Sequence, residues 1–185
     1  KNVLYITLEM AEERIAERVD ANLFDVTIDD LHAMPKDMYD NKVSKLQKKT
    51  IGQLIIKEYP TASAHSGHFR ALLNELSLKK TFKPDVVFID YLNICASSRF
   101  KGGNISSYFY IKAIAEELRG LAVEFDVPIF SATQTTRSGF TSTDIGLEDT
   151  AESFGLPATA DFMFALISND ELDQLNQLKV KQLKN

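Results

Sequence analysis

The stretch from Asp85 to Asn93, with the sequence DVVFIDYLN, decides the fold. Residues 86–89 are β-branched or aromatic without an alternation of polar side chains, which predicts a strand covered on both faces, as in a parallel sheet. Asp90 then ends this strand at the edge where such sheets bind ligands. A carboxylate there can hold a hydrated Mg²⁺ on nucleotide phosphates, although a plain aspartate that ends a strand fits the pattern as well.

Other apolar runs alternate with helical patterns along the chain. Strands are predicted over residues 2–8, 54–59, 127–133, 161–168 and 178–184, and helices over residues 9–23, 66–78, 108–122 and 148–154, with a further solvated helix before residue 49. Gly155 and Pro157 are expected to close the helix over 148–154. The alternation predicts one α/β domain over residues 1–185, a doubly wound and mostly parallel sheet flanked by helices.

Helical spacing assigns the inner and outer faces of these helices. The positions expected to face inward are Met10, Ile15, Val19 and Leu23 in the first helix and Phe69, Leu72, Leu73, Leu76 and Leu78 in the helix over 66–78. In the helix over 108–122, Ile111, Ala115 and Leu118 are expected inside. Glu116, Glu117 and Arg119 are expected on its wet side.

Composition excludes several classes of protein. The 185 residues are 44% hydrophobic and contain no run of about eighteen uncharged apolar residues, so a soluble, cytoplasmic protein without a membrane contact is expected. Cys95 is the single cysteine, which rules out a disulfide framework and indicates a buried thiol. His65 and His68 have no third ligand near them in the sequence, so no metal site is expected there.

Two more polar side chains follow predicted strands. Glu9 follows the first strand, and Gln134 follows the strand over 127–133. A glutamine at such a tip can donate to a phosphate and accept from a water at once. As alternatives to a role in ligand binding, Glu9 could instead cap the following helix, and Gln134 could have no function.

Two loops beyond strand tips carry positive charge. Residues 97–104 include Arg99 and Lys101, and residues 135–143 include Arg137. Such loops can touch phosphates, while ordinary polar connections are the alternative.

The segments KNVLYITLEM, FIDYLNI, SATQTTR and EDTAESFGLPATADF resemble the RecA-like ATPase domain of DnaB-type replicative DNA helicases, and within them the T-even bacteriophage group. The resemblance covers nearly the whole chain and implies a hexameric helicase that uses ATP and Mg²⁺ to move on single-stranded DNA, with a primase and a helicase loader as partners. It implies that Glu9 polarises the attacking water, Asp90 holds Mg²⁺ and Gln134 senses the γ-phosphate. It makes Arg99, Lys101 and Arg137 candidate DNA contacts.

The chain departs from the family in two places. It contains no G-x-x-x-x-G-K-S/T phosphate loop, so it is expected to be a fragment that begins after that loop and its central strand. Lys184 matches the first residue of the family's trans-acting Lys-x-Arg element, whose arginine is not in the sequence. This chain by itself is therefore expected to be inactive. Two alternatives remain: a non-catalytic RecA-like adaptor and a recombinase-type ATPase.

Overall fold

Four parallel strands form the central sheet, in the order β2-β1-β3-β4. The structure is a computed structural model that describes residues 1–100, 105–135, 146–147 and 155–185. The strands are β1 (Val3–Thr7), β2 (Leu54–Glu58), β3 (Val86–Asp90) and β4 (Ile129–Ser131). A second, antiparallel sheet contains β5 (Met163–Ile167) and β6 (Lys179–Lys184). The predicted α/β class and mostly parallel sheet are confirmed.

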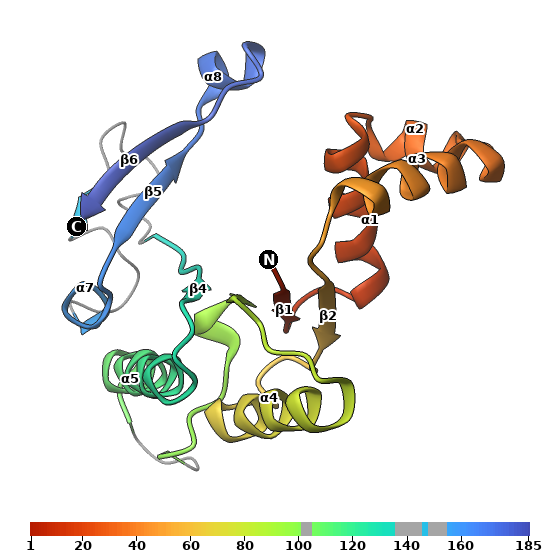
Figure 1. The fold of residues 1–185 in the computed structure, drawn as a ribbon. Helices are drawn as coiled ribbons and strands as arrows, with labels where there is room; N and C mark the ends of the chain where they lie inside the picture. Colours follow the sequence, from red (N-terminus) through yellow and green to blue (C-terminus); the bar gives the residue numbers. More distant parts are fainter. Residues whose placement is uncertain (101–104, 136–145, 148–154) are drawn as a thin grey trace.

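Helices α4 (Ser66–Lys80) and α5 (Ser107–Phe125) cover one face of the central sheet (Figure 1). They bury Leu4 and Ile6 of β1 and Val87 and Ile89 of β3, each at most 1% exposed, in one core. The alternating residues of the same strands point to the other face. The sheet is therefore anchored from the side of α4 and α5.

The prediction that the central strand is covered on both faces is wrong for the described part of the chain. Phe88 is 36% exposed and Phe130 is 45% exposed. The run reads as continuously apolar because aromatic rings line this second face: Tyr5 stacks on Phe88 at 6.1 Å and Phe88 on Phe130 at 5.3 Å between ring centroids. Contact between neighbouring strands, and not a covering helix, accounts for these side chains.

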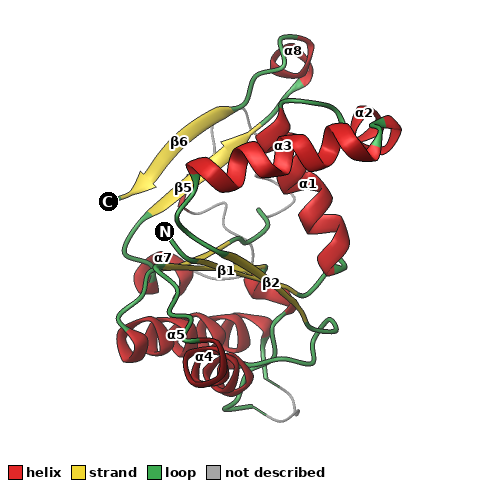
Figure 2. Cartoon of the chain, turned by 45° about the vertical axis from the view of Figure 1, so that its right-hand side comes forward, coloured by secondary structure: helices red, strands yellow, loops and turns green. Residues whose placement is uncertain are grey.

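Three helices form a separate layer, which Figure 2 shows on the opposite side of the sheet from α4 and α5. They are α1 (Glu12–Phe24), α2 (Ile28–Ala33) and α3 (Lys36–Lys49), and they share a small core around Ala21, Phe24 and Leu31. The short helix α7 (Gly155–Thr159) packs on α5, and α8 (Asp170–Gln174) connects β5 to β6. No helix among the described residues has the length and apolar character that crossing a membrane requires.

Two inward assignments are wrong. Leu23 is 55% exposed because Ala21 and Phe24 take the inner face of α1. Leu76 is buried, and Leu78 lies two residues further along the same helix. Because two residues turn a helix by about half a turn, Leu78 faces away from the core and is 84% exposed. Spacing alone would have excluded Leu78, whereas Leu23 follows Ile15 and Val19 at intervals of four residues and fits a helical stripe.

The helix expected to end at Gly155 and Pro157 is also corrected. Gly155 and Pro157 both lie within the helical segment α7, so neither ends a helix. Residues 148–154, over which that helix was predicted, lie outside the described residues.

Candidate functional site

The parallel register brings the C-terminal tips of the strands together. Thr7 at the end of β1 lies opposite Asp90 at the end of β3, and Ser131 of β4 pairs with Ile89. Beyond the strands, the Leu8 N–H donates to the Asp90 carbonyl at 2.9 Å, and the Leu92 N–H donates to the Ala132 carbonyl at 3.2 Å. The segments that carry Glu9, Asp90 and Gln134 therefore leave the same edge of the sheet.

Asp90 is half-buried and fixed by a tyrosine on the neighbouring strand. The Tyr5 hydroxyl donates to Asp90 Oδ2 at 2.8 Å. Burial, together with this hydrogen bond, raises the pKa of Tyr5 above its usual value, so the phenol stays protonated and remains a donor. The bond restrains one carboxylate oxygen.

Glu9 lies in the bend between β1 and α1. Thr7 Oγ1 donates to the Met10 carbonyl at 2.8 Å and accepts from the Met10 N–H at 3.0 Å. Thr61 Oγ1 donates to the Leu8 carbonyl at 2.6 Å. The predicted helix start at Glu9 is wrong, because α1 begins at Glu12. Glu9 is thus exposed on a fixed bend, and its carboxylate makes no hydrogen bond or ion pair within the described part of the chain.

Gln134 lies three residues beyond β4 and contacts the residue after Asp90. Its Nε2 donates to the Tyr91 hydroxyl at 3.1 Å. Among the described residues, Asn93 Oδ1 and Thr133 Oγ1 are buried side-chain oxygens without a hydrogen-bond partner. Both follow the strand tips that end in Asp90 and Ser131. These two oxygens are closed to solvent, whereas the side chains of Glu9, Asp90 and Gln134 at the same edge keep some exposure to it.

This donor set fits Mg²⁺ bound together with a nucleotide. Mg²⁺ keeps most of its waters and takes one or two carboxylates plus phosphate oxygens, so a dedicated cage is not needed. The described residues contain no group of three His, Cys, Asp or Glu side chains of the kind that holds an ion alone. At this edge Asp90 is the half-buried carboxylate, held by Tyr5, and Glu9 is the exposed one.

The other predicted site residues have different partners or lie outside the described residues. Arg99 leaves the segment after the 3₁₀ turn Leu92–Ile94 and forms an ion pair with Glu116 of α5. Lys184 on β6 donates to the carbonyls of Pro157 at 2.7 Å and Ala160 at 2.6 Å. Lys101 and Arg137 lie outside the described residues.

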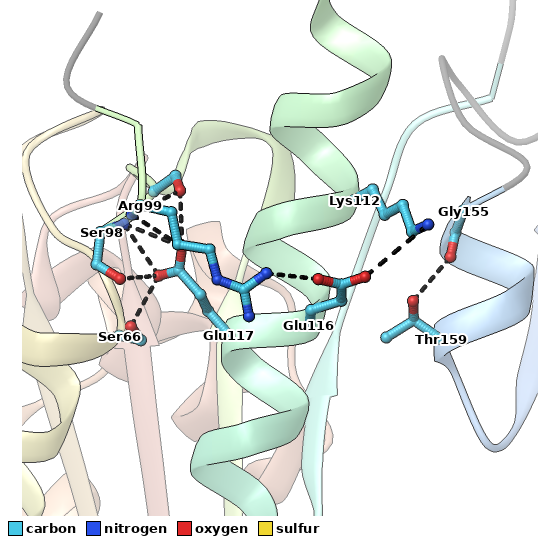
Figure 3. Close-up of polar contacts among 9 residues, drawn as sticks. Ser66, Ser98, Arg99, Lys112, Glu116, Glu117, Gly155 and Thr159 are labelled. Atoms are coloured by element: carbon cyan, nitrogen blue, oxygen red, sulfur yellow. Dashed lines mark hydrogen bonds and ion pairs between the residues drawn. The ribbon is translucent and has the colours of Figure 1, made fainter.

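Glu117 is a correction, because it is buried and not on the wet side of α5. It is 9% exposed, and its carboxylate accepts from Ser66 Oγ at 2.8 Å, Ser97 Oγ at 2.6 Å and Ser98 Oγ at 2.7 Å (Figure 3). Burial alone would raise the pKa of Glu117, but the hydrogen bonds from Ser97, Ser98 and Ser66 outweigh burial and lower it to about 2. The carboxylate is therefore ionised and internally solvated.

A family model for the DnaB-like helicase C-terminal domain matches residues 1–183. This chain belongs to the family of DnaB-like helicase C-terminal domains. It is 49% identical over 187 residues to the DnaB-like replicative helicase of Enterobacteria phage T4, across 99% of this chain and 39% of the relative. It is 29% identical over 139 residues to a probable plasmid replicative DNA helicase of Chlamydia trachomatis, across 74% of this chain and 29% of that relative.

Solved structures share the fold of this DnaB-like domain. A structure of a DnaB-like replicative helicase and its interactions with primase aligns with a TM-score of 0.78 and 21% identity, over 100% of this chain and 45% of that one. A solved ATPase domain aligns with a TM-score of 0.79 and 20% identity, over 100% of this chain and 67% of that one. These neighbours confirm the RecA-like fold, and the chain spans about two fifths of the length of the phage relative.

Three residues of this DnaB-like domain that the site involves were missed from the sequence. Tyr5 could have been found from register, because aligning LYIT with VFID places Tyr5 two residues before the partner of Asp90. Glu117 could have been found from phase, since it follows Ile114 by three residues and precedes Leu121 by four. No signal in the sequence pointed to Tyr91, whose hydroxyl meets Gln134.

Proposed function

We propose that this chain is part of the ATP-hydrolysing domain of a replicative DNA helicase, which couples hydrolysis to movement on single-stranded DNA and to duplex unwinding. The observation that carries the proposal is the convergence of Glu9, Asp90 and Gln134 at one edge of the sheet in a DnaB-like domain. The names of the phage and chlamydial relatives, both replicative helicases, support the same activity.

Each residue has a part that its surroundings allow. Glu9 is unpaired among the described residues and exposed, so it can accept a proton from an attacking water. Asp90, restrained by Tyr5, would hold Mg²⁺. Bound Mg²⁺ would offset charge on the nucleotide phosphates. Gln134 would sense the γ-phosphate, and its contact with Tyr91 links that sensor to the strand that carries Asp90.

The proposal includes partners that match the family. Arg99, Lys101 and Arg137 would contact phosphates of single-stranded DNA in the channel of a homohexamer. Lys184 would act in trans, at the site of a neighbouring subunit. To do so, it would have to give up its hydrogen bonds to the carbonyls of Pro157 and Ala160 within its own chain. A primase and a helicase loader are the expected further partners. The expected compartment is the cytoplasm, of the host cell if the gene belongs to a phage.

The phosphate-binding loop is proposed to come from sequence outside these 185 residues. No G-x-x-x-x-G-K-S/T stretch occurs in them. In the described part of the chain, β4 pairs with β3 alone and β5 with β6 alone, which leaves an edge of each sheet without a strand. A strand leading into the phosphate loop could pair there, and the exposed ring of Phe130 on β4 would then gain a neighbour.

Strand displacement by the complete protein tests the proposal. A forked duplex with a labelled strand is incubated with ATP and Mg²⁺, and strand release is followed with time. We expect release that needs both hydrolysable ATP and a single-stranded tail, and that Glu9→Gln abolishes. ATP hydrolysis without unwinding would favour a recombinase-type ATPase, and neither activity would favour a non-catalytic adaptor.

A further inference from the structure

Two neighbouring glutamates of α5 have opposite surroundings (Figure 3). Glu117 is buried and accepts hydrogen bonds from three serines that lie on two separate segments of the chain. Glu116 lies on the outer side of the helix with its side chain 38% exposed, and its partners are two cations, Arg99 at 2.5 Å and Lys112 at 3.9 Å. The two carboxylates therefore meet the same loop in different ways.

Glu117 holds the backbone from which Arg99 extends. The Ser98 N–H donates to both carboxylate oxygens at 3.0 Å, and the Arg99 N–H lies 3.4 Å from Glu117 Oε1. The third serine, Ser66, begins α4, so the carboxylate joins α5, α4 and the segment after the 3₁₀ turn. Charge-assisted hydrogen bonds of this kind are strong when buried, so this part of the loop is fixed.

Glu116 holds the charged end of the same arginine. The Arg99 guanidinium is reached from solvent, since its side chain is 51% exposed. Ion pairs that face water are weak and exchange with other anions. A phosphate offers the planar guanidinium a bidentate partner, so it can compete with a single carboxylate for Arg99.

We propose that Glu116 is the counter-ion that a phosphate of single-stranded DNA displaces from Arg99, and that Glu117 is the positioning residue that keeps the Arg99 backbone in place during the exchange. The inference rests on the proposed function, because it takes Arg99 to be a DNA contact. It predicts opposite effects of the same substitution at adjacent positions. Removing the charge of Glu116 strengthens DNA binding, whereas removing the charge of Glu117 weakens it.

The test measures binding of a fluorescein-labelled oligo-dT strand to the complete protein by fluorescence anisotropy, with a non-hydrolysable ATP analogue and Mg²⁺ present. We expect Glu116→Gln to lower Kd by roughly three- to tenfold, and Arg99→Ala to cancel most of that gain in the double variant. Glu13→Gln on α1 is the matched control for a lost surface charge, since Glu13 is exposed there. It is expected to leave Kd within about twofold.

Glu117→Gln is expected to raise Kd. It should also make the plot of log affinity against log salt concentration less steep by about 0.7, the loss of about one phosphate contact. Arg99→Ala is expected to change the slope by the same amount. A residue with a purely structural role would weaken binding without changing that slope. If Glu117→Gln does not fold, Ser98→Ala removes one donor of the same carboxylate and is expected to shift Kd in the same direction.

The binding data distinguish a loop that does not contact DNA from a loop that contacts DNA without Glu116 as counter-ion. Absent binding to oligo-dT, or an affinity that Arg99→Ala leaves unchanged, would contradict the DNA role of the loop and this inference with it. If Arg99→Ala weakens binding while Glu116→Gln behaves like wild type, or if the gain from Glu116→Gln persists in full beside Arg99→Ala, only the counter-ion inference is overturned.

Discussion

Side chains of one chemical type have different roles here because their neighbours differ. Glu9 is exposed without a partner in the described part of the chain, Glu116 pairs with cations at the surface, and Glu117 is buried among hydroxyl and amide donors. Residue identity in the sequence could not separate them, because burial and hydrogen-bond donors decide the pKa and the availability of a carboxylate.

Asp90→Asn is expected to weaken Mg²⁺-dependent nucleotide binding by about tenfold or more, since the amide has the shape of the carboxylate without its charge. The measurement is a Mg²⁺ titration of a fluorescent ATP analogue bound to the complete protein. Asp85→Asn is the control, because Asp85 lies just before the other end of β3 and accepts from the Asn2 N–H at 2.6 Å. An equal effect of both substitutions would contradict the metal role.

The buried carboxylate of Glu117 gives a prediction on pH. Its ordinary pKa is 4.5, and the fold lowers it to about 2, so the ionised form stabilises the native state. This contribution, on the order of 3 kcal/mol, is complete above about pH 5 and is lost as the pH falls toward 2. The thermal melting point of wild type should exceed that of Glu117→Gln at pH 7, and the difference should shrink below pH 5. A difference that grows on acidification would contradict this account.

At the scale of elements, the positions of the strands and their mostly parallel arrangement follow from the sequence more readily than helical phase. The apolar runs that became β1, β2, β3 and β4 were predicted with nearly correct bounds, because each is short, apolar and ends at a polar tip. Leu78 and Glu117 were assigned to the wrong sides of their helices, because apolar character was placed inside and charge outside ahead of periodicity. The prediction that the second face of the sheet is covered was wrong, because rings that stack between strands make an exposed face look as apolar as a buried one.

The phase of α4 can be tested by paired substitutions. Leu76→Ala removes a side chain that is 5% exposed in the main core and is expected to cost about 2 to 5 kcal/mol in unfolding free energy. Leu78→Ala, two residues on and 84% exposed, is expected to change it by less than about 0.5 kcal/mol. Thermal melting of the two variants is the measurement. Equal losses would contradict the observed phase.

The loop that carries Arg99 gives a prediction on coupling. Replacing Arg99 and Lys101 together by Ala is expected to lower DNA-stimulated ATP hydrolysis more than basal hydrolysis, since phosphate contacts matter only when DNA is bound. The two rates are compared in the same preparation, with and without oligo-dT. A parallel fall of both rates would indicate damage to the fold instead of a lost DNA contact.

At the scale of the whole molecule, the parallel sheet brings the segments of Glu9, Asp90 and Gln134 to the C-terminal ends of its strands. Glu9, Asp90 and Gln134 could be predicted from the sequence as strand-tip residues, whereas Tyr5 and Tyr91 depend on register and on backbone geometry between strands. The family match covers nearly the whole chain, and the chain spans about two fifths of the phage relative. Hydrolysis is therefore proposed for a longer protein that supplies the phosphate loop.

The most direct test of the central claim is ATP hydrolysis by the complete protein with and without single-stranded DNA, compared between wild type, Glu9→Gln and the control Glu13→Gln. We predict that DNA raises the wild-type rate and that Glu9→Gln lowers it by about 10² to 10⁴ while nucleotide binding persists. Glu13→Gln should match wild type. Full hydrolysis by Glu9→Gln would contradict the assignment of the strand-tip carboxylates as the hydrolysis site.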